Sequence, residues 1–194
     1  MNRKPNLTTD MKKIFTLCAV LLAAATAMAQ DGAKVYGIRS GSFKTEMDMM
    51  GQTISQTTYF DDYGAKQSTS VSMMGMEMTQ IVKDGKNYLV NKAEKSVQEM
   101  PMQQQSVNYL NLTDEVIAKN KIKEVGKDTV AGKECTKYTL EISQMGQTAK
   151  ATVSVWNGIP MKTDIDAGGF NIVTKVVEVT EGPVDAALFE IPKF

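Results

Sequence analysis

Short β-type segments separated by tight turn signals constrain this chain more than any other feature of its sequence. Six such segments lie between Val35 and Met102, and the turns between them include Asp84-Gly85, the strongest hairpin signal in the chain. Six strands in so short a stretch leave no room for the long crossovers that parallel pairing needs. The sequence therefore predicts an antiparallel meander, with strands at residues 42–50, 53–60, 66–74, 76–83, 87–90 and 96–100.

Two of these segments alternate between two kinds of residue along their length. In the first, Phe43, Thr45, Met47 and Met49 share one face, and Lys44, Glu46 and Asp48 share the other. In the fourth, Met76, Met78, Gln80 and Val82 are opposed to Glu77, Thr79, Ile81 and Lys83. This alternation predicts a sheet with one covered, apolar face and one wet face.

The pattern changes after residue 102 and returns after residue 120. Thr113 precedes Asp114-Glu115 as a helix N-cap does, and Val116 and Ile117 offer an apolar side, so one or two short helices are expected here as a plug or lid on the sheet. Strands are expected again at residues 121–126, 134–144, 148–156, 161–165 and 170–180, and a short helical turn at 184–189. The sequence thus predicts a mainly β (α+β) single domain built on one large, strongly curved antiparallel sheet.

The N-terminal residues have the organisation of a secretory signal peptide. Lys12 and Lys13 form a positive region, an apolar stretch follows, and Ala27-Met28-Ala29 is a small-x-small cleavage site, so residues 1–29 are interpreted as the signal and 30–194 as the mature domain. Residues 1–10 add nothing to this signal, so translation is expected to start at Met11; the alternative is that they lengthen the positive region. Because Cys18 lacks the small preceding residue of a lipobox, export to the periplasm without a lipid anchor is predicted.

The composition argues against several function classes. The chain contains no histidine, which removes Ser-His-Asp and Cys-His catalysis and His-ligated zinc, and no enzyme or cofactor is predicted. Lys and Arg together number 22 and Asp and Glu 22, with no basic run, so nucleic acid is not an expected partner. Cys135 is the one cysteine after residue 29, and it is expected to be buried and inert.

Several motifs resemble those of secreted proteins in the lipoprotein-carrier-like (LolA-like) superfamily. Gly126 is followed by Thr129-Val130-Ala131-Gly132 and then by Cys135-Thr136-Lys137-Tyr138, and the chain closes with Phe189-Glu190-Ile191-Pro192. The resemblance implies an incomplete β-barrel of about eleven strands wrapped over a helical plug, with an apolar cavity between them. Members with known roles bind acyl chains, lipoproteins or misplaced envelope proteins. Arg39 is the only arginine of the mature chain, and no arginine is placed as a latch, which puts lipoprotein trafficking in doubt.

Methionine is unusually frequent, with fourteen in the chain. Three interpretations are open. Methionines in alternate positions fill irregular gaps in a core, or line a cavity for variable apolar ligands, since the side chain is flexible and polarizable. Alternatively, the thioethers of Met73, Met76 and Met78 bind Cu(I).

The preferred hypothesis is a periplasmic, non-enzymatic protein that holds a lipid, a lipoprotein acyl chain or another apolar ligand in the cavity of a half-barrel. Peripheral contact with the envelope membrane or a membrane protein is compatible with it. The alternatives are a Cu(I)-binding protein and an envelope-stress or assembly factor that binds polypeptide. The residues predicted to line the cavity are Phe43, Met47, Met49, Met76, Met78, Val82, Leu110 and Trp156.

Overall fold

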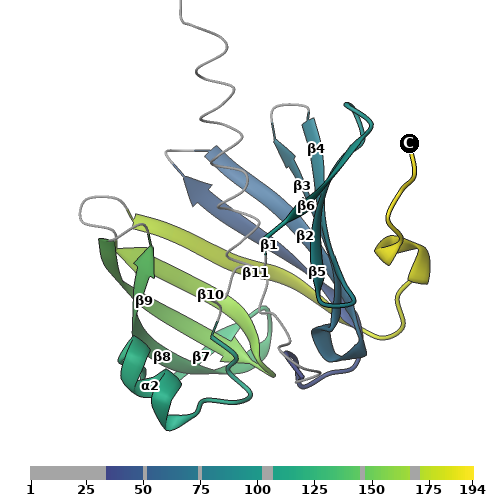
Figure 1. Ribbon diagram of the computed structural model, residues 1–194. Coiled ribbons are helices and arrows are strands. Elements are labelled where there is room, and N and C mark those ends of the chain that lie inside the picture. Colours follow the sequence, from purple (N-terminus) through teal and green to yellow (C-terminus); the bar gives the residue numbers. More distant parts are fainter. Residues whose placement is uncertain (1–33, 50–51, 74–75, 102–106, 145–146, 167–170) are drawn as a thin grey trace, which may run out of the picture.

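The protein is described here by a computed structural model that covers residues 34–49, 52–73, 76–101, 107–144, 147–166 and 171–194. Its architecture is one antiparallel sheet of eleven strands in the order β6-β5-β4-β3-β2-β1-β11-β10-β9-β8-β7 (Figure 1). The predicted single curved sheet is therefore confirmed for these residues. The predicted signal peptide at residues 1–29 and its cleavage site lie outside them.

The sheet consists of two meanders that meet in its middle. The first contains β1 (Gly41–Met49), β2 (Gln52–Asp61), β3 (Lys66–Met73), β4 (Met76–Lys83), β5 (Lys86–Asn91) and β6 (Ser96–Met100). The second contains β7 (Lys123–Val130), β8 (Lys133–Gln144), β9 (Gln147–Trp156), β10 (Ile159–Asp166) and β11 (Asn171–Glu181). Within each meander every strand pairs with its sequence neighbour, and β1 pairs with β11 to join the two.

The largest departure from the predicted strand boundaries is in β7. The strand expected to end at Gly126 continues as β7 to Val130. Gly126 is accommodated within the strand by a shift in register between Glu124 and Gly126, with φ at 139°. A glycine inside a strand pattern marks a bulge as well as an end, because only glycine adopts such a φ without strain.

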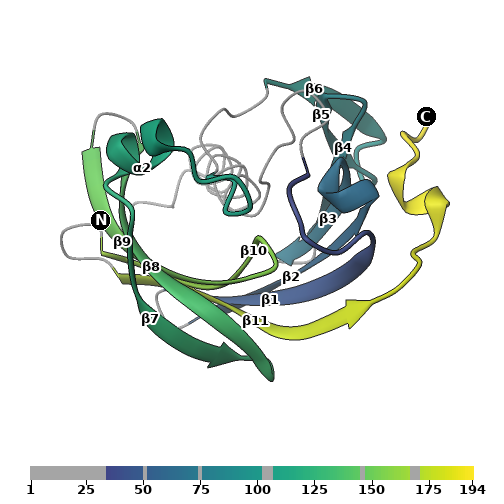
Figure 2. The same ribbon diagram turned by 90° about the horizontal axis from the view of Figure 1, so that it is seen from below.

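The predicted N-cap is confirmed, and the helix that it begins is short. Helix α2 (Asp114–Asn120) follows Thr113, whose Oγ1 accepts a hydrogen bond from the Val116 N–H at 3.3 Å. The helix lies on the concave side of the sheet, over β8 and β9 (Figure 2). Within the described residues it covers one end of the concavity, where one or two short helices were expected as a plug or lid on the sheet. The part of that prediction on residues 103–106 lies outside the described residues.

The segment ahead of β1 is held by backbone hydrogen bonds to two turns. The N–H groups of Val35 and Tyr36 donate to the Tyr63 carbonyl, each at 2.9 Å, and the Gly37 N–H donates to the Asn157 carbonyl at 2.8 Å. Tyr63 belongs to the 3₁₀ turn η1 (Asp62–Gly64) between β2 and β3. These bonds bring the Tyr36 ring into a fully buried cluster with Phe43 and other core residues.

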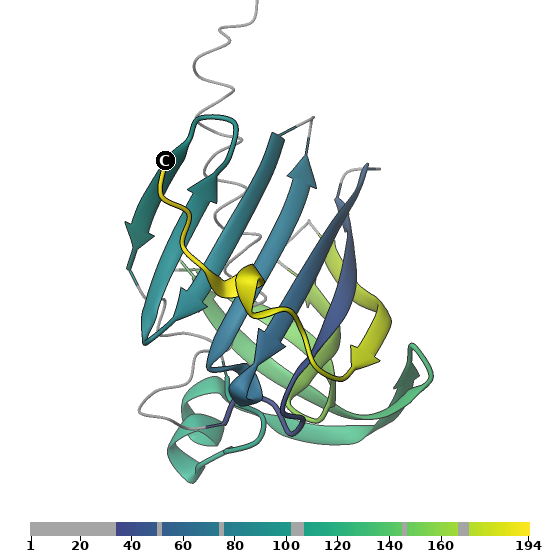
Figure 3. The ribbon, with the colours of Figure 1, turned by 90° about the vertical axis from the view of Figure 1, so that its right-hand side faces the viewer.

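The C-terminal segment lies on the opposite, convex side of the sheet (Figure 3). Its short 3₁₀ helix η2 (Ala186–Phe189) contacts β3 and β4, and Phe189 is buried. This explains why β4 departs from the predicted alternation. Ile81 and Thr79 were expected on a wet face, but both are buried along with Gln80 and Val82. The prediction of one wet face is wrong for β4, because the chain's own C-terminus covers it.

Candidate functional site

The concave face of β1–β6 carries no charged residue at any described position. Directly paired residues on neighbouring antiparallel strands share a face, so the register gives rows across the sheet. One row contains Phe43, Thr58, Thr69, Gln80, Leu89 and Gln98; the next contains Phe60, Gln67, Val82, Asn87 and Met100; the third contains Thr45, Gln56, Val71, Met78, Asn91 and Ser96. The charged strand residues take the alternate, convex positions, among them Lys44, Glu46, Lys66, Glu77, Lys83 and Glu99.

The other half of the concave face is already covered by the chain. Leu140, Ala151 and Val153 of β8 and β9 form a buried cluster, against which the half-buried Val116 and Ile117 of α2 pack. Val107, Tyr109 and Leu112, which precede the helix, pack against the same cluster. The concave residues of β1–β6 lie outside this cluster, and those around Phe43 and Phe60 are packed instead against Tyr36 of the segment ahead of β1.

An apolar cluster occupies the middle of the concave face of β1–β6. Val71 and Met78 are buried on neighbouring strands, and Ile54 and Leu89 pack against them from either side. Such a surface favours the burial of apolar ligand groups, at about 0.8 kcal/mol for each methylene removed from water. The cluster is the first of two parts of the candidate site.

The second part is a band of buried, uncharged polar side chains beside the apolar cluster. The Oγ1 atoms of Thr58 and Thr69 lie 2.9 Å apart in a hydrogen bond. The Tyr36 hydroxyl donates to Gln67 Oε1 at 3.1 Å, and Gln80 Nε2 donates to Asn87 Oδ1 at 2.8 Å. All of these polar residues are buried. The concave face therefore combines apolar contact with hydrogen-bonding groups that carry no charge.

Gln80 differs from the other members of this band. Its side-chain oxygen Oε1 is buried and has no hydrogen-bond partner within the described residues. Buried polar atoms are nearly always paired in folded proteins, because an unpaired one retains the cost of its desolvation. The alternation of residues along β4 predicts that Gln80 shares a face with Met78 but gives it no role, since a glutamine in an alternating strand does not show whether its amide is paired.

The structure brings some of the predicted cavity residues together and separates others. Phe43, Met47, Met78 and Val82 are all buried at concave positions of β1 and β4. Leu110 is 43% exposed, in the turn ahead of α2.

Trp156, at the end of β9, is half-buried and packs against the core cluster that contains Tyr36, Phe43 and Phe60. The Lys133 Nζ lies 4.4 Å from the centre of the Trp156 ring. The assignment of Trp156 to a ligand cavity stays a prediction.

The methionine predictions are tested only where the side chains are described. Met47 and Met78 are 7% and 5% exposed on the concave face. The predictions for the side chains of Met49, Met73 and Met76 lie outside the described residues, so copper binding by Met73, Met76 and Met78 stays a prediction. Among the described residues, no group of three or more Cys, Asp or Glu side chains is placed to hold a metal ion.

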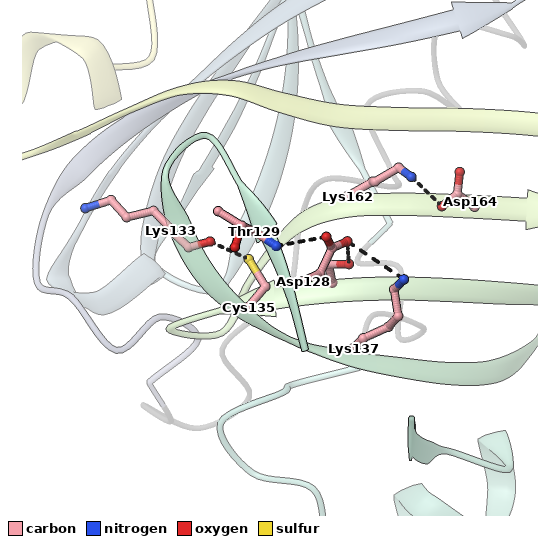
Figure 4. A network of polar contacts seen from close by, with 8 residues as sticks. Asp128, Thr129, Lys133, Cys135, Lys137, Lys162 and Asp164 are labelled. Atoms are coloured by element: carbon pink, nitrogen blue, oxygen red, sulfur yellow. Dashed lines mark hydrogen bonds and ion pairs between the residues drawn. The ribbon is translucent and has the colours of Figure 1, made fainter. Parts of the chain in front are cut away.

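The convex face of the second meander carries a network of polar contacts (Figure 4). Asp128 Oδ2 accepts a hydrogen bond from Ser154 Oγ at 2.8 Å and lies 4.0 Å from Lys137 Nζ. The hydrogen bond from Ser154 is the main cause that lowers the pKa of Asp128 below its usual value. These partly exposed contacts join β7 to β8 and, across it, to β9, and exposed ion pairs of this kind contribute little to stability.

Cys135 lies at the edge of this network and is buried, as predicted. Its Sγ donates to the carbonyl of Lys133 at 3.4 Å. Burial raises the pKa of the thiol, which keeps it protonated at neutral pH, and the thiolate is the reactive form.

Comparison with known proteins finds likeness in structure alone. No family model and no curated protein sequence matches the chain. Among solved structures, the complex of Pseudomonas aeruginosa MucA/MucB matches with a TM-score of 0.56 and 12% identity, over 79% of this chain. An uncharacterized conserved protein from Thermus thermophilus matches with a TM-score of 0.55 and 10% identity, over 92% of this chain and 95% of its own. The chain shares the fold of these solved structures.

These matches support the fold that the sequence motifs led us to expect. At these identities the likeness extends to the fold alone. The chain also spans only 56% of the matched chain in the MucA/MucB complex. Within the described residues, no helix is both long and apolar enough to cross a membrane.

Proposed function

We propose that this protein is a non-enzymatic binding protein of the bacterial envelope, exported to the periplasm, that holds a lipid, a lipoprotein acyl chain or a similar apolar ligand on the concave face of β1–β6. The observation that carries the proposal is the absence of charge from every described concave position of these six strands, combined with the apolar cluster around Val71 and Met78. A charged side chain would oppose burial of an acyl chain, since its desolvation is costly.

The first test identifies what the protein carries. The protein is expressed with its own N-terminal segment, purified gently after export, and analysed by native mass spectrometry before and after organic extraction. A co-purified lipid supports the proposal and gives its class. If no lipid is recovered and fluorescent fatty acids fail to bind, the proposal is wrong.

The second test places the ligand on the concave face. Leu89 and Tyr88 are adjacent, half-buried residues of β5, and they point to opposite faces of the sheet. Leu89→Lys introduces a charge on the concave face and should weaken fatty-acid binding at least tenfold. Tyr88→Lys introduces the same charge on the convex face and should leave binding within a factor of two. Equal losses in both folded variants would contradict the assignment of the site.

A second candidate function is the binding of a partner polypeptide. It is favoured by one observation, that the similar protein MucB is found in complex with MucA(peri). The TM-score to that complex is 0.51, and the chain spans 53% of the matched chain. The two candidates differ in what co-purifies, so the same mass spectrum distinguishes a bound lipid from a bound peptide.

A further inference from the structure

We infer that the ligand of the concave face carries an uncharged secondary amide beside its apolar chain, and that Gln80 Oε1 accepts the hydrogen bond of the ligand's amide N–H. This inference rests on the proposed function, because it names the ligand class for the same face. It is carried by the buried, unpartnered oxygen of Gln80 next to the Val71 and Met78 cluster.

The orientation of the Gln80 amide is set by its neighbour. Gln80 Nε2 donates to Asn87 Oδ1 at 2.8 Å, across the β4–β5 pair. With the nitrogen held in this way, the oxygen cannot exchange places with it without losing that bond. Gln80 is 6% exposed, so bulk water does not readily satisfy Oε1. The side chain therefore presents an acceptor without a partner to whatever occupies the site.

A hydroxyl group close to Gln80 supplies the complementary donor. Thr69 lies directly opposite Gln80 in the β3–β4 register, so the two side chains are neighbours on the concave face. Thr69 and Thr58 share one hydrogen bond between their Oγ1 atoms, and both hydroxyls are buried. Two hydroxyls have two hydrogens, and this bond uses one of them, which leaves the other to donate to a ligand.

An amide matches this pair of groups better than the other common acyl linkages. Its N–H can donate to Gln80 Oε1, and its carbonyl can accept from the spare threonine hydroxyl. An ester has the carbonyl but no N–H, so it would leave Gln80 Oε1 unpaired. A carboxylate or phosphate would bring a charge to a face that has no cation among its described positions, and burying an unpaired charge is costly.

The experiment uses two probes that differ at one atom. N-methyldodecanamide and methyl dodecanoate have the same chain length and the same number of heavy atoms, and an N–H in the first replaces the ester oxygen of the second. Binding of each to the exported protein is measured by isothermal titration calorimetry. The wild-type protein should prefer the amide by about tenfold, the usual order for satisfying one buried acceptor.

A substitution then tests whether Gln80 is the residue that accepts the hydrogen bond of the ligand's amide. Gln80→Met keeps the length of the side chain but removes the acceptor, and it should reduce the preference to within about twofold. The matched control is Gln98→Met, at an exposed position on the concave face of β6 at the sheet's edge, which should retain the full preference. Circular dichroism confirms that both variants fold. If Gln80→Met does not fold, the ligand class is decided by comparing how tightly the wild-type protein binds the amide and the ester.

The outcomes separate this inference from the proposed function. If both probes bind equally well to the wild-type protein, the ligand class is wrong, for instance because a bound water satisfies Gln80, while the apolar site stands. A preference that persists in folded Gln80→Met also overturns the inference. If neither probe binds and no lipid co-purifies, the proposed function fails and the inference fails with it.

Discussion

Tyr36→Phe tests whether the buried polar band stabilises the fold. Tyr36 is fully buried, and its ring lies 4.8 Å from that of Phe60 and 6.1 Å from that of Phe43, measured between centroids. The substitution keeps these ring contacts and removes only the hydroxyl that donates to Gln67 Oε1 at 3.1 Å. Loss of a buried hydrogen bond of this kind should lower the free energy of unfolding by about 1–2 kcal/mol.

The assay is urea unfolding followed by the fluorescence of Trp156, the only tryptophan in the chain. The unfolding midpoint should fall without a change in the slope, and the melting temperature should drop by about 2–4 °C for each kcal/mol lost. Tyr88→Phe, on the convex face of β5, is the control and should change the free energy of unfolding by less than about 0.5 kcal/mol.

A double-mutant cycle decides whether the loss comes from the bond to Gln67. If the bond stabilises the protein, Tyr36→Phe and Gln67→Met together should cost less than the sum of the two separate losses, by about 1 kcal/mol. Strictly additive losses would refute the reasoning, as would a Tyr36→Phe protein as stable as the wild type.

Three further predictions concern other parts of the fold. Phe189→Ala should lower the free energy of unfolding by about 3–5 kcal/mol in urea, because it empties the buried contact of η2 on the sheet. Gly64→Ala should lower the melting temperature more than Gly85→Ala. Both glycines have a positive φ, so both substitutions strain the backbone. A Cβ at Gly64 would also lie 2.8 Å from the Tyr36 ring, whereas a Cβ at Gly85 would meet nothing within 4 Å. Burial raises the pKa of Tyr109, so at high pH the folded state keeps a proton that the unfolded chain releases. The free energy of unfolding, measured in urea, should therefore be constant with respect to this group below about pH 10 and fall as the pH rises above it. The fall should be less steep in Tyr109→Phe. A Tyr109→Phe slope equal to the wild type's would contradict this last assignment.

Most of the fold could be predicted because its pairing is local. A hairpin needs only two alternating segments and a turn, and signals such as Asp84-Gly85 lie within a few residues of the strands that they join. The N-cap at Thr113 is equally local, and the structure confirms it. Gly126 was misjudged because a bulge and a strand end require the same residue, and the partner strand decides between them.

What the sequence could not predict depends on contacts between distant segments. The burial of Ile81 arises because the C-terminal turn around Phe189 returns across β4, about a hundred residues later in the chain. Alternation placed Met78 and Gln80 together on one face, which the register confirms. It gave no sign that the amide nitrogen of Gln80 is paired and the oxygen is not, because that depends on the side-chain geometry of Asn87 in the neighbouring strand.

The order of the strands also has a consequence for how the chain assembles. Among the described strands, every pairing joins sequence neighbours except that of β1 with β11, in which Gly41 meets Glu181. Contacts close in sequence form quickly, whereas closing a loop of this length costs more entropy and comes later. Each meander can therefore form on its own. The concave face of β1–β6 would then exist before β1 pairs with β11 and completes the sheet.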